Sequence, residues 1–240
     1  MKKYILYLGA LVSAASLSFA DLANDSASNY SSATFTSGAN EGSGFGAWTL
    51  ASNNGGSYVG GTAMGDPAFG LWANWGGNSS ATRALASELA AGETISLDIG
   101  HTDNMDGEVG ISLLDGNSTV FNIKISNITA GQWKIWDGGV DFNAGQGWQA
   151  NYPLSFSFTY NGTVDGQESY DWSFGETASG TDFRTSNAIN SIDAIQIYNN
   201  GQNGGNLGFD NLSVIPEPAT VGLFGLAGIV GTFVRRKFAV

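Results

Sequence analysis

The stretch Leu-Ser-Phe-Ser-Phe-Thr-Tyr at residues 154–160 alternates large apolar side chains with small hydroxyl side chains. Successive side chains of a β-strand point to opposite faces, so this alternation predicts a strand with one buried face and one solvated face. The same period recurs outward along the chain at residues 94–99, 109–114, 121–126, 170–174 and 195–197. Weaker strands are expected at residues 45–50, 68–74, 81–85, 132–137 and 207–214.

Turn-forming residues separate these segments, for example Asp115-Gly116-Asn117 and Asn199-Asn200-Gly201. The strands follow one another at intervals of about 10 to 20 residues, with no helices alternating between them, and such a pattern favours antiparallel pairing. We therefore predict an all-β protein, a two-sheet antiparallel β-sandwich of the jelly-roll or concanavalin-like type. Aromatic residues make up 12% of the 240 residues, which excludes an intrinsically disordered chain.

The N-terminus has the three parts of a secretory signal. Lys2 and Lys3 precede an apolar stretch that runs to about residue 17, and Ser18 and Ala20 are the small residues that signal peptidase reads. Cleavage after Ala20 would leave Asp21 as the first mature residue. The sequence therefore predicts an exported protein.

A second apolar segment lies near the C-terminus. Residues 219–234 contain no charge, and Arg235, Arg236 and Lys237 follow directly. A helix of this length would measure about 24 Å, somewhat less than the hydrocarbon core of about 30 Å, so it would span only with its ends at the interfaces. The basic cluster favours a cytoplasmic C-terminus, with the preceding chain outside.

The sequence Pro216-Glu217-Pro218 stands immediately before this run, and its two prolines hold the backbone extended. With the apolar run and the basic end, it resembles the PEP-CTERM sorting signal of Gram-negative bacteria. This resemblance implies processing by an exosortase, transient anchoring in the inner membrane through the C-terminal helix, and then release to the cell surface or an extracellular matrix. The ectodomain is also similar to jelly-roll-like domains that bear this signal.

These features predict four parts of the chain. They are a signal peptide at residues 1–20, a flexible N-terminal segment at 21–44, a β-sandwich ectodomain at 45–215 and a sorting segment at 216–240, with its transmembrane run at 219–234 and its basic tail at 235–237.

Charge and composition narrow the classes of partner. Residues 21–217 contain 21 carboxylates and only 4 cationic side chains, a formal charge of −17. Such a surface repels nucleic acid and anionic lipid headgroups, so neither is expected as a partner. The chain has no cysteine, which excludes disulfides, thiol nucleophiles and cysteine-based zinc sites.

No run of the sequence matches a known catalytic motif. A concanavalin-like glycosidase would carry paired carboxylates close together on one strand, and such a run is not present here. The single histidine, His101, follows a predicted strand, where a hydrogen-bonded structural role is the simpler interpretation. We therefore assign no catalytic residue and expect no cofactor other than a structural metal ion.

That metal would be calcium. Asp103, Asp106 and Glu108 place carboxylates close together in a loop that also contains a glycine, and calcium prefers oxygen ligands in such loops. The EF-hand spacing does not fit, because Met105 occupies a ligand position. A solvated turn without a metal is the alternative.

Tryptophan side chains near amides suggest a carbohydrate ligand. Trp72, Trp75, Trp133 and Trp136 lie among Asn, Asp and Gln residues, and an exposed indole can stack on a sugar ring while amides bind its hydroxyls. Core packing is the competing explanation for each ring. The function predicted is a non-enzymatic surface or matrix protein associated with exopolysaccharide. The alternatives are a glycan hydrolase or lyase on the same scaffold and a purely structural coat protein.

Overall fold

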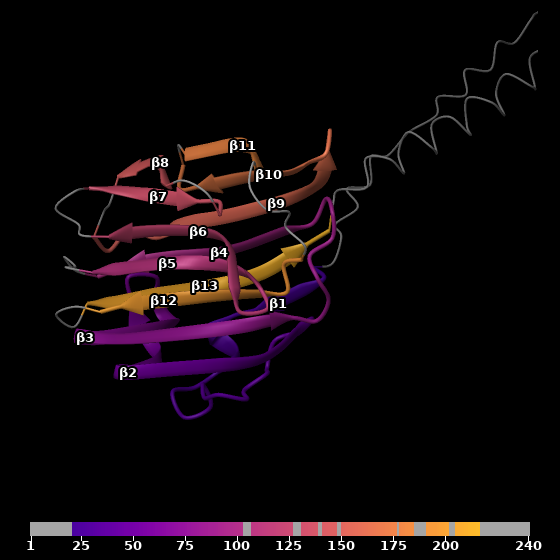
Figure 1. Cartoon of the computed structure of the whole chain (residues 1–240). Helices are drawn as coiled ribbons and strands as arrows, with labels where there is room; N and C mark the ends of the chain where they lie inside the picture. The colour runs from indigo at the N-terminus through magenta and orange to yellow at the C-terminus, as the bar shows by residue number, and fades with distance from the viewer. Residues whose placement is uncertain are drawn as a thin grey trace, which may run out of the picture.

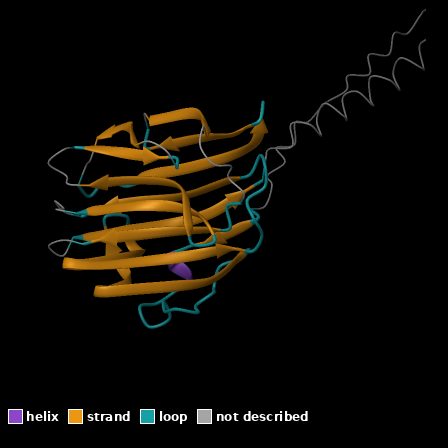
Figure 2. Cartoon of the chain, in the orientation of Figure 1, coloured by secondary structure: helices purple, strands orange, loops and turns teal. Residues whose placement is uncertain are grey.

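The computed structural model describes residues 21–102, 107–126, 131–138, 141–147, 150–176, 178–184, 191–201 and 205–216. Strands dominate these residues, and Figure 2 shows one short helix among them. The strands are β1 (Ala23–Asp25), β2 (Phe45–Thr62), β3 (Gly65–Leu85), β4 (Thr94–His101), β5 (Glu108–Asp115), β6 (Ser118–Ser126), β7 (Gln132–Trp136), β8 (Asp141–Gly147), β9 (Leu154–Val164), β10 (Gln167–Phe174), β11 (Ala178–Arg184), β12 (Ala194–Asn200) and β13 (Asn206–Ile215), and the 3₁₀ turn is η1 (Ala27–Asn29).

The hairpin of β9 and β10 illustrates how local sequence sets the turns. Only Asp165 and Gly166 connect the two strands, and both have positive φ, at 53° and 80°. A two-residue connection with two positive φ values matches the right-handed twist of the flanking strands. The pairing then places Phe158 beside Trp172 and Phe156 beside Phe174.

The strands pair in the order β11-β10-β9-β4-β13-β3-β12-β5-β6-β7-β8. The long strand β3 joins the two halves of this order, because it pairs with β13 near Leu71 and with β12 near Thr82. In Figure 1 the strands run side by side from β2 and β3 at one side of the molecule to β8 and β11 at the other, where these last two strands approach each other. We call β11, β10, β9, β4 and β13 the first layer and β12, β5, β6, β7 and β8 the second layer.

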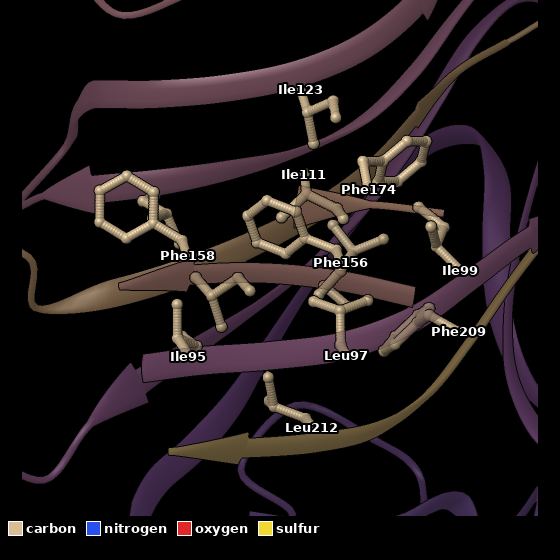
Figure 3. Close-up of a cluster of buried hydrophobic side chains, with 14 of the residues drawn as sticks. Ile95, Leu97, Ile99, Ile111, Ile123, Phe156, Phe158, Phe174, Phe209 and Leu212 are labelled. Carbon is tan, nitrogen blue, oxygen red and sulfur yellow. The ribbon is translucent and has the colours of Figure 1, made fainter. Parts of the chain in front are cut away.

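The core fills the space between the two layers. Phe121 of the second layer packs against Phe156, Phe158 and Tyr170 of the first, with ring centroids 4.9 to 6.1 Å apart. Figure 3 shows apolar side chains from several strands converging on this space. The alternation read at residues 154–160 is confirmed, since Leu154, Phe156 and Phe158 are at most 3% exposed. The fold is the antiparallel β-sandwich that the sequence predicts.

The N-terminal segment departs from its prediction. Residues 21–44 are not a flexible tail, because β1 pairs with β13 and both Tyr30 and Phe35 are buried. Asp25, 1% exposed, forms an ion pair with the fully buried Arg83 at 3.1 Å. A buried charge of this kind needs its partner, so Arg83 in β3 fixes the segment against the sandwich.

The signal peptide and the sorting segment lie outside the described residues, except for Pro216, the first residue of the sorting segment. The signal peptide ending at Ala20 and the run at 219–234 therefore stay predictions at the level of structure. No helix within the described ranges is both long and apolar enough to cross a bilayer.

Candidate functional site

A groove of about 430 Å³ lies on the outer face of the second layer. We define it by the residues that line it, which are Asn78, Ser79, Ser80, Glu108, Ser112, Thr119, Asn122, Lys124, Trp136, Gln196, Tyr198 and Asn200. All of them lie on the five strands β3, β12, β5, β6 and β7. Its volume falls within the range of about 300 to 1,000 Å³ typical of small-molecule sites.

Strand alternation brings these side chains to one surface. In β12, Ile195 and Ile197 point into the core and are fully buried, so Gln196 and Tyr198 project to the outer face. The register then aligns residues of neighbouring strands into rows across the sheet. One row runs from Gln196 through Ser112 and Asn122 to Trp136.

A glycine makes room for the central tyrosine. Gly110 lies opposite Tyr198 in the pairing of β5 with β12. A Cβ atom at Gly110 would come within 2.7 Å of the Tyr198 hydroxyl and 2.4 Å of the Ile123 carbonyl oxygen. Only a residue without a side chain therefore lets the phenol ring lie across β5.

Hydrogen bonds hold the Tyr198 hydroxyl in place. It donates to the Glu108 carboxylate at 3.0 Å and accepts from the Asn122 amide at 3.2 Å. The same Asn122 amide also donates to the Ser112 hydroxyl at 2.9 Å. Burial, followed by the negative charge of Glu108, raises the pKa of Tyr198 well above its usual value. The phenol is therefore protonated at neutral pH and acts as a hydrogen-bond donor, not as a base.

A three-member charge group borders this tyrosine. The Lys124 ammonium lies 3.6 Å from the Glu108 carboxylate and 3.8 Å from that of Asp141 in β8. All three side chains are partly exposed, so the pairs fix side-chain positions more than they stabilise the fold. Lys134 stands opposite Lys124 in the pairing of β6 with β7 and is exposed.

The four candidate tryptophans occupy different environments. Trp136 is partly exposed and lines the groove. Trp75 is 70% exposed at an irregularity of β3, and Trp72 is partly buried with its ring beside Gly56. Trp133 is 2% exposed and packs on Phe174 with ring centroids 4.7 Å apart. Trp133 is thus a core residue, and the prediction of a glycan contact there is wrong because its strand turns this side chain inward.

The structure describes only part of the loop predicted to bind calcium. Asp103 and Asp106 lie outside the described residues, so the calcium site stays a prediction. Glu108 begins β5, and its carboxylate contacts Tyr198 and Lys124 on the groove side. His101 ends β4 and is 3% exposed, away from the residues that line the groove.

The sorting residues Glu217, Pro218, Arg235, Arg236 and Lys237 lie outside the described range, and Pro216 is its last residue. Their assignment as a sorting signal therefore rests on the amino-acid sequence.

Sequence reasoning missed most of the groove. Tyr198, Asn122, Gln196 and Lys124 come from strands that are distant along the chain, and no short motif joins them. A signal was available in the strands themselves, because Asn122 stands between Phe121 and Ile123 and Tyr198 directly follows Ile197, all three of which are buried. Both side chains are only 7% exposed, and buried polar side chains are the informative exception to the rule that polar residues stay at the surface.

The fold defines the class of protein as a jelly-roll β-sandwich. Three solved structures of this architecture align with most of the chain at about a tenth sequence identity. A structure reported for endo-acting O-glycanases of human gut microbiota aligns with a TM-score of 0.55, 9% identity and coverage of 82% of this chain and 99% of that one. An endo-β-1,4-glucuronan lyase from Trichoderma reesei aligns with a TM-score of 0.51, 10% identity and coverage of 68% and 88%. The globular domain of T. cruzi calreticulin aligns with a TM-score of 0.50, 9% identity and coverage of 78% and 90%. At such identities the similarity establishes the fold alone.

The C-terminal segment identifies the protein further. Residues 214–237 match the PEP-CTERM protein-sorting motif, which covers the predicted Pro-Glu-Pro sequence, apolar run and basic cluster. The chain is therefore an exported protein that carries the sorting signal recognised by an exosortase. No curated protein matches the chain.

Proposed function

We propose that this exosortase-processed protein binds polysaccharide in the groove and resides on the cell surface or in the extracellular matrix. The observation that carries the proposal is the composition of the groove, in which Trp136 stands in one row with Asn122, Ser112 and Gln196. Indole rings stack on the apolar faces of sugars, while amide and hydroxyl groups bind sugar hydroxyls.

The rigidity of the groove supports binding. Its side chains project from paired strands, and Tyr198 and Asn122 are held by the hydrogen bonds described above. A site that is ordered before binding loses less conformational entropy when a ligand arrives.

Binding should be measured with the full-length chain in detergent and with exopolysaccharide isolated from the producing organism. We expect affinity electrophoresis to show retardation of the wild type, a loss of about tenfold or more with Trp136→Ala, and no loss with Trp75→Ala. Equal retardation of the wild type and Trp136→Ala would reject the groove as the binding site. No retardation of any variant would leave the structural coat protein as the function.

A glycan-active enzyme is the second candidate, and one observation favours it. Glu108 and Asp141 contact the same ammonium at 3.6 and 3.8 Å, so their nearest oxygens lie less than about 8 Å apart. Pairs of carboxylates separated by about 5 to 9.5 Å hydrolyse glycosidic bonds in many hydrolases. Lys124 occupies the space between this pair, where the scissile bond would have to lie, so binding without cleavage ranks first.

Cleavage has its own assay. Wild-type protein incubated with the exopolysaccharide should release neither reducing ends nor unsaturated sugars. Release that disappears in both Glu108→Gln and Asp141→Asn would establish the enzyme instead.

A further inference from the structure

We propose that the groove selects an uncharged segment of polysaccharide and rejects polymers of uronic acids. This inference rests on the proposed function, since it names the class of ligand for the same groove. It depends on how the charges of the groove are placed and on which of its hydrogen-bond donors carry no charge.

The cation that lines the groove is already engaged. The Lys124 ammonium contacts both the Glu108 and the Asp141 carboxylates, and its side chain is 24% exposed. This face has two carboxylates, Glu108 and Asp141, and two lysines, Lys124 and Lys134. Their charges cancel, so the described residues of this face carry no net positive charge. A polyuronate presents one carboxylate on each sugar. To offset the desolvation of these carboxylates, the groove would need several unpaired cations or several hydrogen-bond donors directed at the ligand.

The central donors point toward groups of the protein itself. The Tyr198 hydroxyl donates its proton to Glu108, and the Asn122 amide donates to Ser112, Tyr198 and the Ile111 carbonyl oxygen. A sugar hydroxyl can both donate and accept, so it fits beside Glu108 as a donor. A sugar carboxylate can only accept, and it would meet the negative charge of Glu108.

The net charge of the rest of the domain also disfavours an acidic polymer. Residues 21–217 have a formal charge of −17, and a polyanion is repelled by such a field before it reaches the groove. Screening in physiological salt shortens this repulsion to about 8 Å, so the local charges of Glu108 and Asp141 decide selection at contact.

The groove is also longer than one sugar ring. It crosses the strands β3, β12, β5, β6 and β7, and four interstrand spacings of about 4.8 Å amount to roughly 19 Å. The lining is polar along this path, with Trp136 as its aromatic end. This shape suits an internal segment of a neutral polymer better than a single sugar.

The matched ligands for the test are one polymer in two charge states. The acidic fraction of the exopolysaccharide is used as isolated and after chemical reduction of its uronic acids to neutral sugars, which keeps every linkage. With the full-length chain in detergent, we expect the reduced polymer to bind at least tenfold more tightly than the acidic one, and this binding to change little between 50 and 500 mM salt. Tighter binding of the acidic polymer would overturn the inference.

A single substitution should invert part of this preference. Glu108→Gln keeps a side chain that can accept from Tyr198 but removes the charge, so Lys124 keeps only Asp141 as a counterion and attracts a ligand carboxylate more strongly. We expect about a tenfold gain in affinity for the acidic polymer, whereas the matched control Glu88→Gln, exposed and away from the groove, should give no gain. Asp141→Asn is the second variant and should give a smaller gain, because Asp141 is the more exposed partner of Lys124.

The outcomes separate this inference from the proposed function. Acidic binding that is lost with Trp136→Ala would retain the groove as a glycan site and reject the neutral ligand. Binding of neither polymer form, with or without Glu108→Gln, would reject both.

Discussion

Two polar clusters of this protein contain the same kinds of side chain, but they are used differently. In the buried cluster, Asp25 pairs with Arg83 and accepts hydrogen bonds from the Tyr30 hydroxyl at 2.8 Å and the Trp48 indole at 3.0 Å. The groove also combines a carboxylate, a cation, a tyrosine and a tryptophan. The two clusters differ in solvent exposure. Both side chains of the Asp25–Arg83 pair are fully buried, whereas Lys124 and Glu108 are partly exposed.

This difference decides what each cluster does. The Tyr30 hydroxyl and the Trp48 indole both donate to Asp25, and Arg83 packs against the Trp48 ring at 4.9 Å and donates to the Ala39 carbonyl oxygen. Both side chains of the ion pair are fully buried and out of a ligand's reach, so the cluster fixes the N-terminal segment on the sandwich. The groove keeps part of its hydrogen-bonding capacity facing solvent, which is the condition for binding.

The largest expected effect comes from breaking the buried cluster. Asp25→Ala leaves the Arg83 charge buried without a counterion and removes the acceptor of Tyr30 and Trp48. We expect a loss of about 3 to 5 kcal/mol in the free energy of unfolding, against less than about 1 kcal/mol for Glu108→Ala in the groove. Urea titrations of both variants measure this, and equal midpoints would mean that the two clusters do not differ as described.

Two tryptophans of one strand give the next test. Trp133→Ala should cost about 3 to 5 kcal/mol because it empties a core position beside Phe174. Trp136→Ala should cost at most about 1 kcal/mol in stability and instead weaken glycan binding. Thermal melts and affinity electrophoresis of the two variants separate the roles. A destabilised Trp136→Ala with intact binding would contradict the assignment.

A smaller loss is expected from crowding the central tyrosine. Gly110→Ala places a methyl group against the Tyr198 hydroxyl and the Ile123 carbonyl oxygen, so the strand or the ring must shift. We expect a cost of about 1 to 3 kcal/mol together with weakened binding. Gly60→Ala in β2, where an added Cβ atom would come no closer than 3.7 Å to the Tyr58 ring, serves as the control for stability. A Gly110→Ala variant with wild-type stability and affinity would show that Tyr198 does not need this space.

The smallest effect is a pH dependence at the alkaline end. Burial and the hydrogen bond to Asp25 raise the pKa of Tyr30 to about 12. Because the folded state holds this proton more tightly than the unfolded state, the contribution is complete below pH 10 and is lost as the pH rises toward 12. Urea midpoints measured between pH 8 and 11.5 should therefore fall more for the wild type than for Tyr30→Phe. Since Tyr160 also has a pKa of about 12, Tyr160→Phe is measured in parallel. Parallel pH curves for wild type and Tyr30→Phe would exclude Tyr30 as the source.

The candidate site was accessible from the sequence only in part. Trp136 could be named, because an indole among amides indicates a sugar contact on chemistry alone. Its neighbour Trp133 could not be separated from it, since the phase of the alternation in residues 132–137 depends on which face meets the other layer. Tyr198 and Asn122 are 76 residues apart, and only the pairing of β12, β5 and β6 brings them together.

The sequence by itself determined most of the strands, the sandwich class and the sorting signal, because period-two alternation, turn residues and the PEP-CTERM motif are all local patterns. It did not predict β1, β8 or β11, and it divided β3 into two strands. Only the tertiary structure decided that residues 21–44 are packed and that the second layer has a groove. The physical reason is that a buried ion pair such as Asp25 with Arg83 joins residues far apart in the chain. Strand order, which no local pattern encodes, sets both that pairing and the rows of the groove.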